Sequence, residues 1–199
     1  VLSAVGKNTA KMTKTPYTAA IIGCGKIAGI KDWPRGNGPI NTHAQAYFRH
    51  PKFRLVAVCD IDAKRSSAFS KVWQIESAFN NVIQLLDHVS PDVISICSPN
   101  KHHLQHLELL LQAETPPKVI FVEKPICNSP DELNFLDGFL IENPVHLLVN
   151  HTRRFDPKHQ DLAAMIQQKM FGGMVMGHCY YYGGWKNNGA HLIDTLRMF

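Results

Sequence analysis

A short glycine-rich loop constrains the fold of this chain more than any other feature. Residues 17–22 are small and β-branched, as in a buried strand, and they lead directly into Gly23-Cys24-Gly25-Lys26-Ile27-Ala28, a match to G-x-G-x-x-[GA]. The first glycine permits a tight turn, the second lets the backbone approach a pyrophosphate, and Ala28 lets a helix pack against the sheet. We therefore expect a βαβ dinucleotide-binding unit whose helix N-terminus faces the phosphates.

The chain up to residue 150 alternates between apolar strands and helical patterns, apart from a loop at 30–41. Strands are expected at 55–59, 92–97, 119–122 and 145–149, and helices at 42–50, 81–89, 101–112 and from Ser129 onward. Continuously apolar strands that alternate with helices indicate a parallel sheet covered on both faces. The sequence thus predicts an α/β fold, with an N-terminal Rossmann doubly wound parallel sheet over residues 17–150.

Residues 151–199 have a different character. They predict an amphipathic helix at 157–170, a partly alternating strand at 174–182 and the start of another helix at 191. Because a lone strand cannot bury its own faces, we expect residues 151–199 to form an incomplete second α/β domain for substrate binding and oligomerisation. Residues 1–16 are expected to be a flexible arm.

Composition excludes several classes of protein. The 21 Lys and Arg residues exceed the 16 Asp and Glu residues only mildly and are scattered, so we expect no nucleic-acid partner. No apolar run reaches the roughly 18–20 residues of a membrane span. The five cysteines form no C-x-x-C pair, and His102 and His106 lack a third ligand, so neither a disulfide framework nor a metal site is expected. Residues 1–15 lack the apolar stretch of a secretory signal, which favours a cytoplasmic location.

Asp60 is the acidic residue that could contact a dinucleotide ribose. It follows the strand at 55–59 and lies 37 residues after Gly23, whereas about 20 is usual; the loop at 30–41 accounts for most of the excess. A carboxylate there can accept hydrogen bonds from a ribose diol and would repel a 2′-phosphate, which favours NAD over NADP. The alternative is a solvated carboxylate at the end of a strand.

Lys124 is a candidate for the reacting centre. It lies in Glu123-Lys124-Pro125, directly after the strand at 119–122, and ligands of open α/β sheets bind outside the carboxyl ends of strands. A lysine there can stabilise charge on a substrate oxygen, or exchange a proton if burial lowers its pKa. An exposed surface lysine is the alternative.

His191 and Asp194 form a second candidate group. Their i, i+3 spacing places them on one helix face, where a carboxylate can orient an imidazole and raise its basicity. The alternative is a histidine at a helix start beside a solvated aspartate.

Together these segments resemble the glucose–fructose oxidoreductase / inositol dehydrogenase / rhizopine catabolism (Gfo/Idh/MocA) family. The resemblance spans nearly all of residues 17–199 and is carried by six segments: Gly23-x-Gly25-x-x-Ala28, Val-Ala-Val-Cys-Asp60, Ser98-Pro99-Asn100 with His103, Glu123-Lys124-Pro125, Arg154-Phe155-x-Pro157 and Gly189-x-His191-x-x-Asp194. It implies a Rossmann domain, a C-terminal α/β domain whose open sheet often mediates homodimers or homotetramers, and NAD(P)-dependent oxidation or reduction of a sugar or cyclitol hydroxyl.

The resemblance also assigns roles to residues. Lys124 would be the catalytic-site lysine and His191 the proton-transferring group. The residues that would line the dinucleotide are Gly23, Gly25, Lys26, Ile27, Ala28, Asp60, Ser98, Pro99, Asn100, His103, Glu123 and Lys124. Those expected to bind the substrate are Lys124, Arg154, Asn187, Asn188 and His191.

One departure bears on the chemistry. Many dehydrogenases of the family carry an Asp where this chain has Asn187, and a neutral amide can hydrogen-bond a sugar but cannot accept a proton. Some nucleotide-sugar members have a similar Asn-Gly-x-His pattern, so we expect a nucleotide-linked or surface-polysaccharide sugar. The alternatives are a lyase or glycosidase that oxidises transiently, a non-catalytic regulator, and a piece that only binds the dinucleotide.

Overall fold

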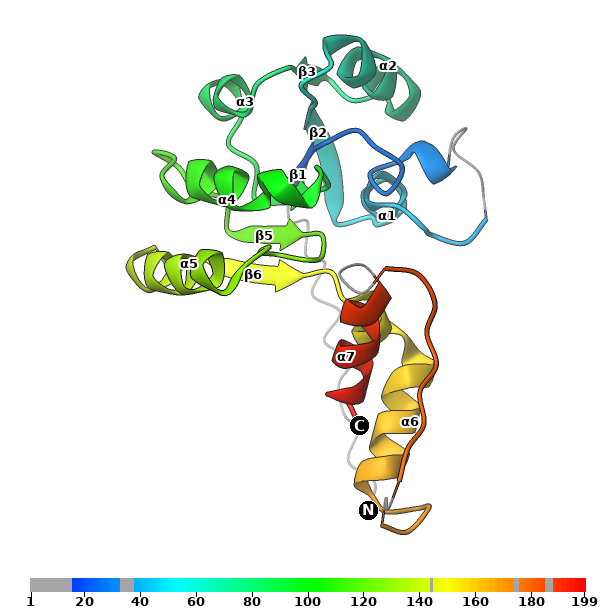
Figure 1. The fold of residues 1–199 in the computed structure, drawn as a ribbon. Helices are drawn as coiled ribbons and strands as arrows, with labels where there is room; N and C mark the ends of the chain where they lie inside the picture. The colour runs from blue at the N-terminus through cyan, green and yellow to red at the C-terminus, as the bar shows by residue number, and fades with distance from the viewer. Residues whose placement is uncertain (1–15, 33–37, 144, 174–175, 185–187) are drawn as a thin grey trace, which may run out of the picture.

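The computed structural model describes residues 16–32, 38–143, 145–173, 176–184 and 188–199. Its centre is a six-stranded parallel sheet in the order β3-β2-β1-β4-β5-β6 (Figure 1). The strands are β1 (Tyr17–Ile22), β2 (Phe53–Cys59), β3 (Ser77–Phe79), β4 (Val93–Ile96), β5 (Val119–Val122) and β6 (His146–Val149). The chain order reverses between β1 and β4, which creates the crevice where ligands bind in such sheets. The doubly wound Rossmann-like α/β fold is confirmed.

Helices cover both faces of this sheet. The α-helices are α1 (His43–Arg49), α2 (Ala63–Trp73), α3 (Val82–His88), α4 (His103–Leu111) and α5 (Pro130–Glu142), with short 3₁₀ turns η1 (Ile30–Asp32) and η2 (Asn100–His102). Ala19 and Ile21 of β1 pack with α1 and α2, whereas Ala20 and Ile22 pack with α3, α4 and α5. The period of two along β1 therefore feeds two separate apolar cores.

Local capping fixes several helix starts. The Ser129 hydroxyl accepts from the Glu132 amide at 3.2 Å, and Pro130 occupies the first turn of α5. Neither α2 nor β3 is among the elements expected from the sequence. The signal for α2 was Asp62, whose carboxylate caps the helix by accepting from the amides of Lys64 and Arg65.

No regular helix follows the glycine loop directly, and the helix expected at 42–50 is confirmed as α1. Residues 25–32 make only helical turns, with Gly29 N–H donating to Gly25 O at 3.3 Å and Lys31 N–H to Lys26 O at 3.2 Å. The regular helix begins at His43, capped by Thr42. The two prolines and two glycines of the 30–41 segment disfavour a continuous helix. The start of α1 nevertheless joins the glycine turn, because Ala44 N–H donates to Ala28 O at 2.8 Å.

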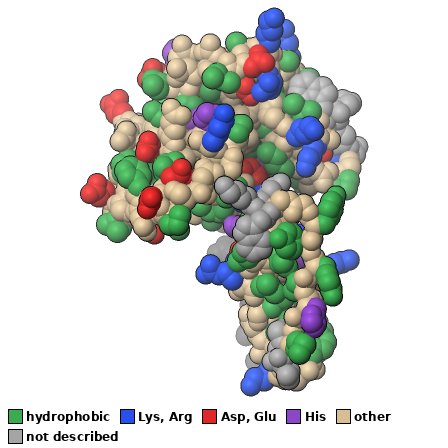
Figure 2. Space-filling view, viewed as in Figure 1, with side chains coloured by type: hydrophobic (Ala, Val, Ile, Leu, Met, Phe, Trp, Pro, Cys, Tyr) green, Lys and Arg blue, Asp and Glu red, His purple; other side chains and the backbone are tan. Residues whose placement is uncertain are grey.

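The remaining elements project from the end of the sheet (Figure 1). They are η3 (Thr152–Phe155), α6 (Pro157–Gln167) and α7 (Ala190–Leu196). The prediction of a strand at 174–182 is wrong over residues 176–182, which form no hydrogen-bonded ladder with a described strand. A strand needs a hydrogen-bonded neighbour, and the described part of the chain places none beside this segment. Figure 2 shows hydrophobic side chains on the visible face of this projection.

The division of the chain at residue 150 stays a prediction. The arm expected at residues 1–16 lies outside the described residues except for Pro16. None of the described helices is long and apolar enough to cross a membrane.

Candidate active site

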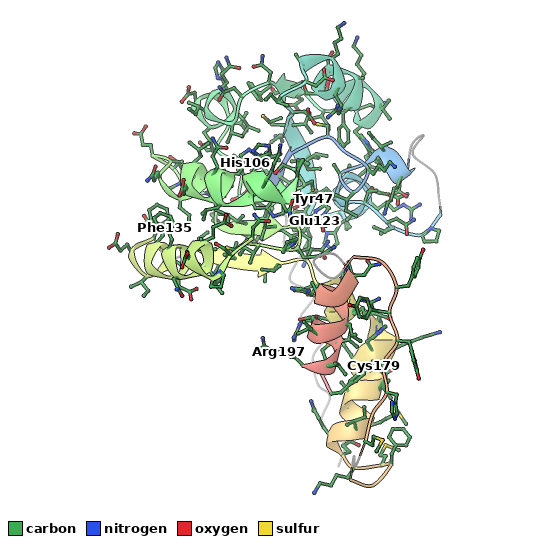
Figure 3. The ribbon with its side chains drawn as sticks, viewed as in Figure 1. Tyr47, His106, Glu123, Phe135, Cys179 and Arg197 are labelled. Carbon is green, nitrogen blue, oxygen red and sulfur yellow. The ribbon has the colours of Figure 1, made fainter. Side chains whose placement is uncertain are left out.

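The principal cavity lies where the carboxyl ends of the strands meet the base of the projection. It has a volume of about 780 Å³. Its lining comes from the β1–α1 connection, from α1, from the ends of β5 and β6, and from the α7 region: Ile27, Lys31, Ile40, Asn41, Thr42, His43, Ala46, Tyr47, Phe121, Glu123, Lys124, Asn150, Thr152, Asn188 and His191. In Figure 3, Tyr47 and Glu123 lie close to the point where α7 approaches the sheet. Lys124 and His191, 67 positions apart in the sequence (191 minus 124), therefore share one cavity.

Glu123 is the only carboxylate among the described residues that line the cavity, and it is held in place. Its side chain is 14% exposed. Its Oε1 accepts from His43 Nε2 at 2.9 Å and from Asn150 Nδ2 at 2.6 Å. Burial by itself raises the pKa of Glu123, but the hydrogen bonds from His43 and Asn150 and the charge of Lys124 lower it by more, so the pKa lies below 4.5. The carboxylate is therefore ionised at neutral pH.

A buried chain of hydrogen bonds supports Glu123 from below. If His43 donates through Nε2, its Nδ1 accepts from Ser95 Oγ at 3.0 Å, and Ser95 in turn accepts from Tyr47 OH at 2.7 Å. This assignment gives a partner to both ring nitrogens of His43 and to the hydroxyls of Ser95 and Tyr47. Burial raises the pKa of Tyr47 to about 12. The phenol therefore keeps the proton that it donates to Ser95.

These supporting residues are not among the site residues expected from the sequence. One signal was available: His43 and Tyr47 have the i, i+4 spacing of neighbours on one helix face. Another was Ser95, a polar residue inside an otherwise apolar strand. A buried hydroxyl of this kind usually has a specific partner.

The His191 imidazole is electrostatically adapted to stay neutral. Burial lowers the pKa of His191 below 6.5, and the positive charges of Lys124 and Arg153 lower it further, against a smaller opposing effect of Glu123. The ring lies edge-on to His151, with centroids 6.5 Å apart. A neutral imidazole at pH 7 can accept a proton.

Asp194 does not contact His191 as the sequence suggests. Its Oδ1 accepts from Arg154 Nε at 2.7 Å, and its Oδ2 lies 3.7 Å from His151 Nδ1, too far for a hydrogen bond. The expectation that it raises the basicity of His191 is wrong, because the carboxylate faces Arg154 and the pKa of His191 is lowered. Arg154, expected to bind substrate, instead joins η3 to the helix that carries His191.

The Arg154–Asp194 pair should contribute measurably to stability. Because Arg154 is partly exposed, we expect Asp194→Asn to lower the free energy of unfolding by about 1 kcal/mol. Arg154→Gln should cost a similar amount, and the double variant should cost less than the sum of both. Urea unfolding of the three variants measures this coupling. Additive losses would show that the two side chains do not stabilise each other.

The two loop glycines differ in what surrounds them. Gly23 has a φ of +92°, and a Cβ there would lie 2.6 Å from the Ser98 backbone nitrogen. A Cβ on Gly25 would meet nothing within 4 Å. Packing against the protein thus explains why residue 23 is a glycine. The open space beside Gly25 instead fits the close approach of a pyrophosphate. Ala28 is fully buried, as a helix-to-sheet packing position requires.

Asp60 lies at the end of β2 beside the glycine loop, as expected, but its carboxylate already has protein partners. It is 7% exposed, and it accepts from the amides of Cys24 at 2.8 Å and Asp62 at 3.0 Å. Arg65 Nη1 lies 3.3 Å from Oδ1. This cation was missed from the sequence, and it offsets part of the repulsion that Asp60 would exert on a 2′-phosphate.

His103 is packed into the protein and does not face a ligand. It is 1% exposed, and its ring nitrogens lie 2.8 Å from Pro125 O and 2.9 Å from Ser98 O. The expected contact with the dinucleotide is therefore blocked by these two partners. His103 instead links the end of β4 to the Glu123-Lys124-Pro125 segment, whose Lys124–Pro125 bond is cis.

The other expected residues have varied surroundings. Ser98 Oγ lies 3.0 Å from His106 Nδ1, and Asn100 Nδ2 donates to Asn128 at 2.9 Å. Lys26 and Pro99 are exposed. Asn188 lines the cavity, whereas Asn187 lies outside the described residues. Within the described ranges, no group of three His, Cys, Asp or Glu side chains could hold a metal ion.

A parallel sheet with this strand order and an open glycine loop defines a Rossmann-type dinucleotide-binding domain. Residues 17–151 match the family described as "Oxidoreductase family, NAD-binding Rossmann fold". The chain belongs to this Gfo/Idh/MocA family of oxidoreductases, whose members act on sugars and cyclitols.

Individual relatives agree with this assignment. The chain is 31% identical over 161 residues to the uncharacterized oxidoreductase YrbE of Bacillus subtilis, covering 81% of this chain and 42% of that protein. It is 31% identical over 121 residues to D-glucoside 3-dehydrogenase of Escherichia coli, covering 61% of this chain and 30% of that protein. The chain thus spans less than half the length of these relatives.

A solved structure shows the same fold. The structure of scyllo-inositol dehydrogenase from Lactobacillus casei, with NAD(H) and scyllo-inositol bound, superposes with a TM-score of 0.77 at 19% identity. The match covers 93% of this chain and 56% of that one.

Proposed function

We propose that this protein is an NAD-dependent dehydrogenase that moves a hydride between nicotinamide and a ring carbinol carbon of a sugar or cyclitol. The observation that carries the proposal is the cavity of about 780 Å³ that Lys124 and His191 line from different parts of the fold. The expected substrate is a nucleotide-linked or surface-polysaccharide sugar. A cytoplasmic homodimer or homotetramer is the expected form of the whole protein.

The described residues fit a dinucleotide along the carboxyl edge of the sheet. The open space at Gly25 admits the pyrophosphate, with Gly23, Lys26, Ile27 and Ala28 forming the rest of the turn. Asp60 would bind the adenosine ribose, and its negative charge favours NAD. Arg65 offsets part of that charge, so NAD⁺ and NADP⁺ must both be tested as cofactors. Ser98, Pro99 and Asn100 would border the dinucleotide from the end of β4, and Glu123 and Lys124 from the end of β5.

The chemistry assigned to this chain is proton transfer and charge stabilisation. When bound, nicotinamide supplies the hydride acceptor. The Lys124 ammonium would donate a hydrogen bond to the reacting oxygen and stabilise the negative charge that develops on it. The neutral His191 imidazole would take the hydroxyl proton. Asn188 would hydrogen-bond a neighbouring sugar hydroxyl, and the ionised Glu123, fixed by His43 and Asn150, would keep the adjacent Lys124 in place.

Cofactor turnover tests this proposal directly. The full-length protein is mixed with NAD⁺ or NADP⁺ and a panel of sugars, cyclitols and nucleotide sugars, and the absorbance of reduced nicotinamide is followed. We expect net reduction with at least one substrate and a preference for NAD⁺. Tight dinucleotide binding with product formation but no net reduction would instead indicate a transiently oxidising lyase or glycosidase.

The pH dependence of sugar oxidation tests the role of His191. Because its pKa is lowered below 6.5, the neutral base persists as the pH falls. We expect kcat/KM to be level near neutrality and to decline only below pH 6.5, as the imidazole becomes protonated. Rates measured from about pH 5 to about pH 8 define this acidic limb of the pH profile, in which kcat/KM declines.

Arg153→Gln provides the matched control for that profile. Arg153 contributes to the lowered pKa of His191, so its removal should move the acidic limb to higher pH. A limb of the wild-type protein above pH 6.5, or one that Arg153→Gln leaves unmoved, would contradict the assignment of His191 as the base.

A further inference from the structure

The connection between β1 and α1 forms one wall of the active-site cavity. Asp60 follows Gly23 by 37 residues instead of about 20, and the extra length lies in the segment 30–41. Five described residues of this connection line the cavity: Ile27, Lys31, Ile40, Asn41 and Thr42. Lys31, Ile40 and Asn41 of the additional segment therefore face the site of the proposed reaction.

Hydrogen bonds to Asp32 join the first half of this connection to its end at Asn41 and Thr42. Asp32 Oδ2 accepts from Thr42 Oγ1 at 2.6 Å, and its Oδ1 accepts from Asn41 Nδ2 at 3.3 Å. Arg49 of α1 adds a third link by donating to Gly38 O at 2.6 Å. These contacts position Lys31, which directly precedes Asp32, at a defined place on the wall.

The described side chains that line the cavity carry more positive than negative charge. Among the described lining residues, Lys31 and Lys124 supply two positive charges, against the single carboxylate of Glu123. Glu123 is already held by His43 and Asn150, and Lys124 is the group proposed to bind the reacting oxygen. Lys31 has no side-chain hydrogen bond or ion pair to any other residue that the structure describes. A second cation is thus present with no assigned partner.

We propose that Lys31 binds an anionic oxygen of the substrate, so that the enzyme acts on acidic sugars that carry a carboxylate or a phosphate. The inference rests on the proposed dehydrogenase function and adds the substrate class. Lysine suits this task because its ammonium is a compact charge on a flexible stem, and a charge-assisted hydrogen bond is stronger than a neutral one.

The test compares neutral and acidic partners on the full-length protein. D-Glucose is paired with D-glucuronate, D-galactose with D-galacturonate, and α-D-glucose 1-phosphate separates phosphate from carboxylate recognition. We expect the wild-type protein to prefer the acidic member, and Lys31→Gln to raise its KM by roughly tenfold or more. The KM for the neutral member should change by less than about twofold, and Lys31→Arg should restore part of the loss.

Lys71→Gln is the control for a general loss of positive charge. Lys71 is exposed in the last turn of α2, and that end of the helix lies at the opposite edge of the sheet from the carboxyl ends of the strands. This variant should behave like the wild type with every substrate.

Binding measurements separate the possible failures. Calorimetric titration with D-glucuronate in the presence of NADH detects the anion site even where turnover is absent, so a protein that binds glucuronate through Lys31 without reducing NAD⁺ would refute only the dehydrogenase proposal. Equal use of neutral and acidic sugars by the wild type would overturn the Lys31 inference alone. A weaker affinity of Lys31→Gln for NAD⁺ would assign the lysine to the cofactor pyrophosphate and would overturn it as well.

Discussion

Replacing Lys124 by methionine is expected to lower kcat for sugar oxidation by about 10²- to 10⁴-fold, the usual contribution of a positioned polar group at a reacting centre. Methionine keeps much of the length and the apolar stem of the side chain but removes the ammonium. The substrate oxygen would then develop negative charge with no cation beside it. Steady-state kinetics of the full-length variant, with the best substrate of the panel, measure the effect.

Lys124→Arg is the informative companion variant. It retains the positive charge, but its planar guanidinium differs in shape and cannot give up a proton near neutral pH. We expect a loss smaller than that of the methionine variant. If Lys124→Met retained kcat to within about threefold, the ammonium would not take part in the chemistry, since a positioned acid or base contributes far more.

Replacing Gly23 by alanine is expected to lower the free energy of unfolding by about 2–4 kcal/mol, through strain at a special backbone position combined with overpacking. Residue 23 has a positive φ, and its new Cβ would lie 2.6 Å from Ser98 N and 2.8 Å from Cys97 C. The backbone cannot easily move away, because Gly23 N–H donates to Cys59 O at 2.7 Å and Cys97 N–H donates to Ile22 O at 2.7 Å. Denaturant unfolding measures the loss.

Gly25→Ala separates packing from ligand approach within the same loop. Its Cβ would meet no protein atom within 4 Å, so the stability should change by less than about 1 kcal/mol. The affinity for NAD⁺ should nevertheless fall by roughly tenfold or more, because the methyl group would occupy the space proposed for the pyrophosphate. Unchanged affinity of this variant would place the pyrophosphate elsewhere, and equal stability of both variants would contradict the packing explanation for Gly23.

The local features of this chain determined most of the Rossmann unit. Residues 17–22 are small and β-branched, and that local character predicts a buried strand. Ser129 and Pro130 mark the start of α5 through capping chemistry that involves only near neighbours. The same holds for the placement of Lys124 at a strand end. These features depend on residues within a few positions of one another, so they can be recognised without the fold.

Which side chains meet depends on the tertiary structure. Glu123 is held by His43, which is 80 residues away in sequence, and Asp194 pairs with Arg154, 40 residues away, instead of with its helix neighbour His191. Lys31 lines the cavity, and its neighbour Asp32 is held there by hydrogen bonds from Asn41 and Thr42. Such contacts depend on how the chain folds back on itself, and the i, i+3 spacing that suggested an Asp194–His191 pair describes only which side chains can meet. A residue with a stronger partner from another element takes that partner, and sequence spacing contains no information about which one it will be.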